Sequence, residues 1–469
     1  MRRSVGLLCV FLAVMAASPP AAAGPLRTGI LDSALFSSPG RQATAFDRTR
    51  QTGASVVRLV LHWDTVAPAT RPPDFDPANP AHPAYRWTEF DRQVQLATSR
   101  GLEPIVAILF APDWAKAGTA STGADIRPNP AEYGKFAEAA ARRYSGSSGL
   151  PRIRYWQAWN EPNRDYFLMP QFAGGRMVSA GWYRRMVTQF AAGVRRAASA
   201  NRVVAGGLAP LGRRGKPAPL AFMRAMLCVT RSGGRACDLR GAPVPFDVWA
   251  HHPYTSGGPT HRAGGRDDVS LGNLPKMRRL LRAAVRLGHV DSRSGPAFWA
   301  TEFSWDTRPP DPQGLAMPLH ARWVSEALYR MWRNGVSVVI WFRIQDDPLR
   351  SSYQQSGFFT ARGSPKRSLT AFRFPVVALR RAGGTYVWGR TPFGAPGRVI
   401  VEIKTGGSWR RLGTVRAGGS GIFTKTFRPR PRRGFVRARF NGERSLPFSL
   451  TYAPDRFVNP FGCGGPVRC

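Results

Sequence analysis

Between residues 26 and 381, apolar runs of strand length alternate with amphipathic stretches of helix length. This alternation is typical of parallel βα units, in which each strand is followed by a helix that packs back onto the sheet. Eight runs have the character of strands, and they cover residues 26–36, 54–63, 101–114, 153–161, 202–210, 246–254, 297–303 and 337–344. Eight such units predict an α/β fold, a (β/α)8 barrel that carries insertions.

The stretches between these runs repeat apolar residues with the period of a helix. In residues 88–100, Thr88 is expected to cap the start of the helix and Gly101 to end it. The same pattern predicts helices over residues 130–144, 181–200, 220–230, 274–287, 319–334 and 368–381. A doubly wound open sheet is the alternative, but no glycine-rich phosphate loop follows the first run.

The pattern changes after Gly383 and Gly384. Residues 385–455 contain short alternating segments separated by Gly, Ser and Pro, without a helical period, which predicts a small β-sandwich. This part resembles the immunoglobulin-like modules of exported bacterial enzymes. We therefore expect a signal peptide at 1–23, a barrel domain at 24–383 and a β-sandwich domain with a tail at 384–469.

The start of the chain has the features of an export signal. Arg2 and Arg3 precede an apolar run at 5–17, and the alanines at 21–23 are small residues suited to cleavage. The run is too short to span a membrane, and no later segment reaches about 18 uninterrupted apolar residues. We expect a secreted or cell-envelope-associated protein without a transmembrane segment, and a monomer.

Four cysteines follow the signal peptide, in two close pairs. Cys228 lies near Cys237, and Cys463 lies near Cys469. An even number of cysteines in an exported chain favours two small disulfide loops. A four-thiolate zinc site would need closer pairs than these, so no metal is expected.

The formal net charge of +40 attracts polyanions without specificity. Arginine supplies nearly all of it in a chain rich in Ala, Gly and Pro, residues with GC-rich codons, so genome composition is an alternative cause. An exported chain without a recognised nucleic-acid motif is not expected to bind nucleic acid. An anionic cell-envelope polymer is the favoured partner, and the arginines of residues 428–439 are either a docking patch or a solvated strand face.

Two aromatic-rich runs end on or near a glutamate. They are IRYWQAWNEPN at 153–163, with Glu161, and PAFWATEFSW at 296–305, with Glu302. Each pattern places a carboxylate at the rim of the sheet, where one glutamate alone could be an ordinary surface group. Two carboxyl groups that face one cleft suffice to cleave a glycosidic bond, one as proton donor and the other as nucleophile or base.

The two motifs together resemble those of the large clan of retaining (β/α)8 glycoside hydrolases, which includes the family 5 cellulase-like and family 39 xylosidase-like enzymes. The resemblance rests on Trp159 to Asn163 in the fourth strand and Thr301 to Phe303 in the seventh, and it spans about residues 50–381. It implies that Glu161 is the general acid/base and Glu302 the nucleophile.

The same resemblance assigns substrate-binding roles near the two glutamates. Asn160 is expected to hydrogen-bond the sugar 2-hydroxyl, although a strand-end amide can also serve nearby backbone. Arg58 matches the arginine that keeps the nucleophile ionised, and a purely structural arginine is the alternative.

Side chains alternate along a strand, so only one of the neighbours His251 and His252 can face the barrel interior. The spacing of the clan fits His252, which would line the sugar site, and Tyr254, which would donate to the nucleophile. Trp341 resembles the aromatic platform under the sugar ring, but an inward tryptophan is also ordinary core. Weaker candidates at the strand ends are His62, Trp63, Asp113, Trp114, Trp305 and Gln345.

These observations predict a retaining glycoside hydrolase that acts on a β-linked polysaccharide or an envelope-derived oligosaccharide, with no metal or organic cofactor. A non-catalytic carbohydrate-binding protein and a transglycosylase remain alternatives. Residues 211–241 and 255–273 are insertions near the predicted site, so the substrate cannot be transferred from one family.

Overall fold

The computed structural model describes residues 24–118, 126–147, 149–239, 241–348 and 354–451. The predicted signal peptide and the Cys463–Cys469 pair lie outside this part of the chain. No helix within it is sufficiently long and apolar to cross a membrane.

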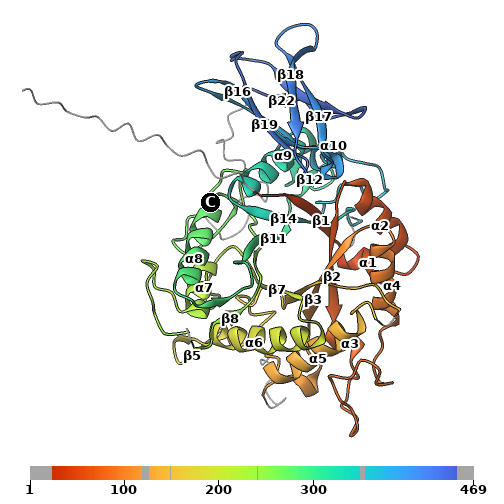
Figure 1. Ribbon diagram of the computed structural model, residues 1–469, viewed down its shortest axis with the longest axis vertical. Helices are drawn as coiled ribbons and strands as arrows, with labels where there is room; N and C mark the ends of the chain where they lie inside the picture. Colours follow the sequence, from red (N-terminus) through yellow and green to blue (C-terminus); the bar gives the residue numbers. More distant parts are fainter. Residues whose placement is uncertain (1–23, 119–125, 148, 240, 349–353, 452–469) are drawn as a thin grey trace, which may run out of the picture.

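Eight parallel strands close into a barrel, as predicted, and the open doubly wound sheet is excluded (Figure 1). In order around the barrel they are β1 (Arg27–Leu31), β2 (Val56–His62), β3 (Glu103–Leu109), β4 (Tyr155–Ala158), β7 (Arg202–Leu208), β9 (Val248–His251), β11 (Ala297–Phe303) and β14 (Val336–Phe342).

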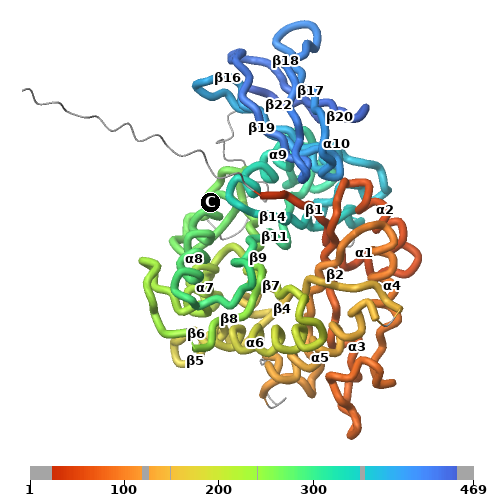
Figure 2. The backbone as a smooth tube through the Cα atoms, viewed as in Figure 1, coloured from red at the N-terminus to blue at the C-terminus, as the bar shows by residue number. Residues whose placement is uncertain are grey.

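Helices surround the barrel (Figures 1 and 2), and they are α2 (Gln42–Gln51), α4 (Thr88–Thr98), α5 (Pro130–Arg143), α6 (Ser179–Ala197), α7 (Pro219–Leu227), α8 (Leu274–Arg286), α9 (Met317–Arg333) and α10 (Arg367–Arg373). Shorter elements lie in the connections: α1 (Ser33–Phe36), α3 (Trp63–Val66), η1 (Asp113–Ala115), β5 (Phe172–Ala173), β6 (Arg176–Met177), β8 (Val244–Pro245), η3 (Leu271–Asn273), β10 (Val290–Asp291), β12 (Thr307–Arg308) and β13 (Leu315–Ala316).

Alternation along the strands divides the apolar residues between two cores. One cluster fills the barrel interior and contains Leu31, Val56, Ile105, Val204, Val248, Ala250, Trp299, Val338 and Ile340. The larger cluster lies between the strands and the helices, and it continues into the C-terminal sheets. The position of a side chain in its strand therefore decides whether it faces the interior or the helices.

The first and third strands are shorter than predicted, and one predicted helix cap is wrong. The first strand ends at Leu31 because the Asp32 side chain accepts a hydrogen bond from the Leu35 amide and starts α1. The third strand ends at Leu109, before the short helix η1. Thr88 is not the cap of α4, because Trp87 precedes the helix and makes no side-chain capping bond.

The helix predicted over residues 368–381 is correct only in its first half. The helix α10 ends at Arg373, and Val376–Arg381 form the strand β15. Pro375 explains the change, because a proline disfavours the helical conformation of the residue before it and lacks the amide that a helix needs. β15 pairs with β16 (Gly384–Arg390) across Gly383, the position where the sequence pattern changes.

The C-terminal part consists of antiparallel sheets that pack beside α9 and α10 (Figures 1 and 2). One sheet has the order β15, β16, β19 (Ile422–Phe427), with η4 (Pro392–Gly394) after β16. The other has the order β18 (Arg410–Ala417), β17 (Gly397–Lys404), β20 (Phe435–Phe440), β21 (Glu443–Arg444), and β22 (Phe448–Ser449) pairs with β20. The all-β character is as predicted.

Aromatic contacts join these sheets to the barrel domain. The ring of Trp388 is fully buried, 5.4 Å from Tyr329 and 5.7 Å from Trp332, both on α9. Arg373 of α10 also forms an ion pair with Glu443 at 2.7 Å. The sheets and the barrel therefore share one apolar interface.

One predicted disulfide lies within the described residues and is present. It joins Cys228 and Cys237, whose Cα atoms are 5.0 Å apart, and it closes the loop after α7.

Candidate active site

The backbone after β4 turns sharply to present Glu161. Trp159 and Glu161 have φ angles of 66° and 37°, in a region that non-glycine residues rarely adopt. The Glu161 amide donates to the Gly207 carbonyl at 3.0 Å, which holds the turn against β7. Such strained positions persist only where the surroundings impose them, and they concentrate at functional sites.

Glu302 depends on an irregularity in β11. Ala300 pairs with Val339 and Phe303 pairs with Trp341, so three steps along β11 match two along β14. The extra residue reverses the alternation of side chains. Phe303 accordingly packs in the outer core, whereas the carboxylate of Glu302 reaches side chains that line the barrel mouth.

Two donors hold the carboxylate of Glu302. Arg58 Nη1 lies 3.0 Å from Glu302 Oε2, and the Tyr254 hydroxyl donates to Oε1 at 2.9 Å. Arg58 is buried, which lowers its pKa, and the negative charge of Glu302 opposes that effect. Its guanidinium remains protonated, so a cation and a phenol both stabilise negative charge on Glu302.

Arg58 also fixes the orientation of Asn160. The other guanidinium nitrogen, Nη2, donates to Asn160 Oδ1 at 2.6 Å. Because the amide oxygen is occupied in this way, the Nδ2 group of Asn160 is left to donate elsewhere.

Glu161 has a different environment. Its Oε1 lies 2.9 Å from His252 Nδ1, and its Oε2 accepts from the Tyr166 hydroxyl at 3.1 Å. Burial raises the pKa of Glu161, and the positive charge of Arg164 and the Tyr166 hydrogen bond partly oppose the increase. Glu161 therefore keeps a proton to higher pH than an exposed glutamate does.

His252 hydrogen-bonds Glu161 and lies 3.9 Å from Glu302. Burial lowers the pKa of its imidazole to about 3, so the ring is neutral at ordinary pH. A neutral ring can donate from Nδ1 to ionised Glu161 or accept there from protonated Glu161, so it accommodates both states.

The distances of the two glutamate oxygens from His252 Nδ1 set an upper limit on the distance between those oxygens. Glu161 Oε1 is 2.9 Å and Glu302 Oε2 is 3.9 Å from His252 Nδ1. These two oxygens can be no farther apart than the sum of the two distances.

The structure thus brings six of the predicted residues together, as two hydrogen-bonded groups that meet where His252 lies 3.9 Å from Glu302: Arg58, Asn160, Tyr254 and Glu302 in one, Glu161 and His252 in the other. They come from β2, β11 and the segments that follow β4 and β9. As expected, His251 points the other way, where its Nε2 lies 2.7 Å from the Val269 carbonyl.

Trp341 is not part of this cluster, so its assignment as a sugar platform is corrected. Val338 and Ile340 face the barrel interior, and alternation turns Trp341 toward the helices. The Trp341 ring is 1% exposed and stacks on Phe358 at 5.1 Å. The alternative reading as core is correct, and Phe342 is the aromatic residue of β14 that faces the interior side.

The weaker strand-end candidates also have other roles. Trp63 and Trp305 are buried core, and Trp114 donates to the Pro68 carbonyl. Asp113 pairs with Lys116, His62 lies beside Asp64 and Gln345 contacts Arg48.

Tyr166 is the site residue that the sequence did not indicate. It is 60% exposed and lies in the loop after Glu161, where only the fold brings its hydroxyl to the carboxylate. An aromatic residue in a polar loop carries no pattern that would single it out.

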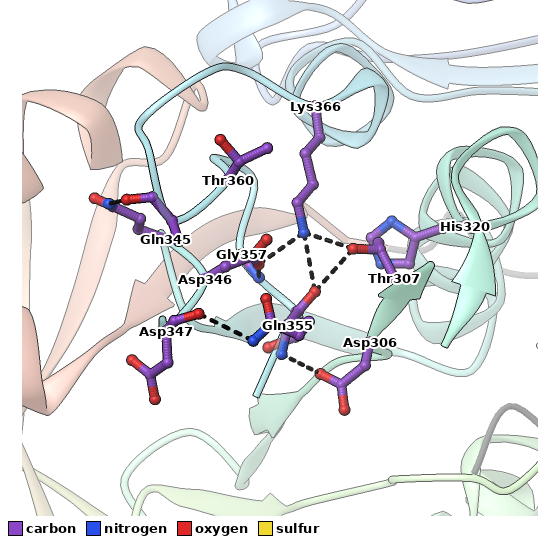
Figure 3. Close-up of polar contacts among 12 residues, drawn as sticks. Asp306, Thr307, His320, Gln345, Asp346, Asp347, Gln355, Gly357, Thr360 and Lys366 are labelled. Atoms are coloured by element: carbon purple, nitrogen blue, oxygen red, sulfur yellow. Dashed lines mark hydrogen bonds and ion pairs between the residues drawn. The ribbon is translucent and has the colours of Figure 1, made fainter. Parts of the chain in front are cut away.

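A second polar cluster ties together the loops that follow β11 and β14 (Figure 3). Lys366, at the start of α10, is buried and donates to Asp346 Oδ1 at 2.7 Å, to the Thr307 hydroxyl at 2.6 Å and to the Gln355 carbonyl at 2.9 Å. Asp306 accepts from the Gln355 amide at 3.0 Å, and burial raises its pKa to about 6. Each of the three ammonium protons of Lys366 has an acceptor. The cluster therefore links the two loops on the face of the barrel that carries the glutamates.

Within the described ranges, no three His, Cys, Asp or Glu side chains gather as metal ligands.

Comparison with known proteins gives matches in structure only, because no family model and no curated protein matches the sequence. A family 39 glycoside hydrolase from the gut symbiont Bacteroides cellulosilyticus WH2 is 16% identical with a TM-score of 0.53, and the match covers 86% of this chain and 81% of that chain.

Two other solved structures give similar values. The GH39 enzyme from Xanthomonas axonopodis pv. citri is 15% identical with a TM-score of 0.53, over 89% of this chain and 95% of that chain. A monomeric beta-xylosidase from Caulobacter crescentus CB15 is 15% identical with a TM-score of 0.53, over 87% and 96%. The comparison establishes a shared fold, the (β/α)8 barrel.

Proposed function

We propose that this chain is a secreted glycoside hydrolase that cleaves β-glycosidic bonds of a polysaccharide or an envelope-derived oligosaccharide with retention of configuration. One observation carries the proposal. Two carboxylates approach the same nitrogen of His252, and their environments differ as the two roles require, a buried carboxyl with a raised pKa at Glu161 and a carboxylate held by a cation at Glu302.

In the first step, Glu302 attacks the anomeric carbon while the bond to the leaving oxygen breaks. Glu161 transfers its proton to that oxygen, so the departing group leaves as a neutral alcohol. The glycosyl group is then bonded to Glu302, and Glu161 is ionised. In this state a neutral His252 donates from Nδ1 to the new carboxylate.

In the second step, a water molecule attacks the anomeric carbon and displaces Glu302. Glu161 accepts a proton from the water, which restores both side chains to their starting states. The Nδ2 group of Asn160 is free to donate to the sugar 2-hydroxyl because Arg58 occupies its oxygen. That contact strengthens as positive charge develops on the sugar.

The bound on the carboxylate separation favours retention. Inverting pairs stand about 6.5–9.5 Å apart, which leaves room for a water molecule, whereas retaining pairs stand roughly 5–5.5 Å apart. The two distances to His252 keep one oxygen of each carboxylate within the sum of those distances, which supports a retaining pair rather than a widely separated inverting one. The family 39 enzymes with this barrel support the choice of a glycoside as substrate.

Labelling with 2-fluoro aryl β-glycosides tests the proposal. At least one sugar of a panel with good leaving groups should increase the mass of the protein by one glycosyl unit. Peptide mapping should find this added mass on the peptide that contains Glu302. Natural substrate should yield product of retained configuration by NMR. Glu302→Gln should abolish labelling, and Asp113→Asn, which changes a carboxylate at the same barrel face, should not.

The other results separate the alternatives. Inverted product, or a label on another residue, contradicts the assignment of Glu302. Binding of sugars without labelling or cleavage favours a carbohydrate-binding protein. Transfer of the sugar to an added saccharide in preference to water favours a transglycosylase.

A further inference from the structure

A groove of about 500 Å³ lies between α7 and α8, which are neighbours in the outer ring of helices (Figures 1 and 2). Its lining contains seven cationic side chains, Arg224, Arg231, Arg266, Lys276, Arg279, Arg282 and Arg286. The lining contains one acid, Asp267, which already pairs with Arg224 and Arg231 at 2.6 and 2.9 Å.

The cations of α8 form a stripe along the groove. Lys276, Arg279, Arg282 and Arg286 are three or four positions apart, so they share one helix face, and we call them the α8 stripe. The stripe is about 15 Å long at the rise of an α-helix. Among the described residues, no carboxylate lies within ion-pairing distance of any member.

Several cations on other helices of the barrel do pair with acids. On α5 and α6, Arg142 and Arg196 both pair with Glu138. On α9, Arg330 pairs with Glu326 at 2.8 Å. A bias toward arginine codons would add arginine everywhere. It does not explain why a helix with five cations and no acid lines a groove.

The stripe has a cost for folding. Like charges three or four residues apart on a helix repel each other and destabilise the helix. Burial and the neighbouring Arg282 lower the pKa of Arg278 on the same helix. A bound anion would relieve this repulsion, because guanidinium groups bind carboxylate and phosphate through paired hydrogen bonds.

The disulfide loop forms one wall of the groove. Cys228 and Cys237 close it, and Arg231, Ser232 and Gly233 at its tip line the cavity. The end of the groove near the start of α8 approaches the catalytic face, because each helix of the barrel begins at the face where its preceding strand ends. Lys276 therefore lies nearer to the two glutamates than Arg286 does.

We propose that the groove between α7 and α8 binds an anionic polysaccharide, whose repeated carboxylate or phosphate groups lie along the α8 stripe. The length of the stripe suits an extended polymer, whereas a single small anion would occupy only two or three of its cations. That the polymer is a glycan rests on the proposed function. A chain held here would extend from the barrel mouth along the outside of the barrel.

Binding is tested on the Glu302→Gln protein, so that no polymer is consumed. The probes are polygalacturonate, a poly(glycerol phosphate) chain, uncharged dextran, duplex DNA and anionic vesicles, and the affinity for each is measured at equal protein concentration. The triple variant Arg279→Gln, Arg282→Gln, Arg286→Gln should lose affinity about ten- to hundredfold for an anionic probe, from three exposed charge contacts. Retention should weaken between about 0.1 and 1 M salt, where the screening length falls from roughly 10 to 3 Å.

The matched control changes the net charge by the same amount elsewhere. Arg410→Gln, Arg411→Gln, Arg416→Gln removes three exposed arginines from β18 and should alter affinity by less than about twofold. Equal loss in both triple variants would overturn the proposal, since it would show attraction to the overall charge.

The comparison between the probes identifies the chemical class of the ligand. Selective binding of polygalacturonate assigns carboxylate groups, and selective binding of poly(glycerol phosphate) assigns phosphate groups; either supports the groove. Equal binding of dextran, or tighter binding of duplex DNA or anionic vesicles than of either polymer, overturns it. The groove variant should keep full activity on a small neutral aryl glycoside, so failure of the hydrolase proposal would appear separately, as inactivity of the unmutated protein.

Discussion

At the residue scale, the two glutamates are distinguished by their donors. Glu302 is held by the Arg58 cation and the Tyr254 phenol, whereas Glu161 is buried beside a neutral His252. A group that must lose and regain a proton benefits from the second environment. A group that must attack as an anion benefits from the first.

Substitution of each glutamate should give a different kinetic defect. Glu302→Gly should abolish turnover with every leaving group, because no other carboxylate can form the glycosyl intermediate. Glu161→Ala should lower turnover about 10²- to 10⁴-fold with poor leaving groups and much less with good ones. Added azide should then yield a β-glycosyl azide, measured by NMR. Equal loss for all leaving groups in Glu161→Ala would contradict its role as acid.

Tyr166→Phe tests how the exposed tyrosine affects Glu161. Its hydrogen bond stabilises the ionised form of Glu161, so removal should raise the pKa of that carboxyl further. The alkaline limb of kcat/KM should shift to higher pH by up to about one unit, the equivalent of one hydrogen bond. The readout is the pH profile on a small soluble substrate.

A matched control separates this effect from a general loss of hydroxyl contacts. Tyr144 also donates to a carboxylate, Asp91 at 2.7 Å, but lies away from the site, directly after α5. Tyr144→Phe should lower stability and leave the pH profile unchanged. An unshifted profile in Tyr166→Phe would remove Tyr166 from the acid's environment.

At the element scale, the loops after β11 and β14 are joined by the hydrogen bonds that the buried Lys366 donates (Figure 3). Asp306 belongs to the same cluster, and burial favours its protonated form. In the pH range between the ordinary pKa of aspartate and about 6, the folded state therefore binds more protons than the unfolded chain. The free energy of unfolding must decrease as pH rises through this range.

Asp306→Asn should remove this pH dependence. The amide oxygen can still accept from the Gln355 amide, and the cost of burying a charge is absent. The variant should be more stable than the unmutated protein above pH 6, by at most about 3 kcal/mol, and equal to it near pH 4. Denaturant unfolding at several pH values measures this.

The exposed carboxylate of Asp74 serves as a control, because Asp74→Asn should change stability little at any of these pH values. Lower stability of Asp306→Asn at neutral pH would mean that the Gln355 amide and Lys366 outweigh the burial of the charge.

At the scale of the whole molecule, the C-terminal sheets are part of the barrel's packing. Trp388 is buried against Tyr329 and Trp332 of α9, the helix that follows β13 and precedes β14. Removal of the sheets would expose this aromatic surface. A chain shortened near Arg381 would therefore change the stability of the barrel as well as any binding by the sheets, and the two effects would not be separated.

Trp388→Ala should therefore destabilise the whole chain by about 3–5 kcal/mol, as other buried tryptophans do. Thermal unfolding should show a lower Tm, and activity should be lost at the same lower temperature. Trp409→Ala is the control, because Trp409 is only half-buried and contacts Arg437 at 4.1 Å. Loss of the sheets' structure while activity persists would show two independent units.

Local patterns were sufficient for the elements of the barrel. Strand and helix periodicity depends on residues close in sequence, so the eight strands and most helices, with α8 at Leu274–Arg286, agree with prediction. The short cysteine spacing likewise predicted the Cys228–Cys237 bond. The positions of Glu161 and Glu302 near strand ends follow from the same patterns.

Only the tertiary structure decided which side of a strand a residue faces and what it meets there. The bulge in β11 turns Glu302 toward Arg58, and regular alternation in β14 turns Trp341 into the outer core. Tyr166 reaches Glu161 from a loop without any pattern. Register, bulges and loop paths depend on partners far along the chain, so their outcome is fixed only when the strands have closed into a barrel.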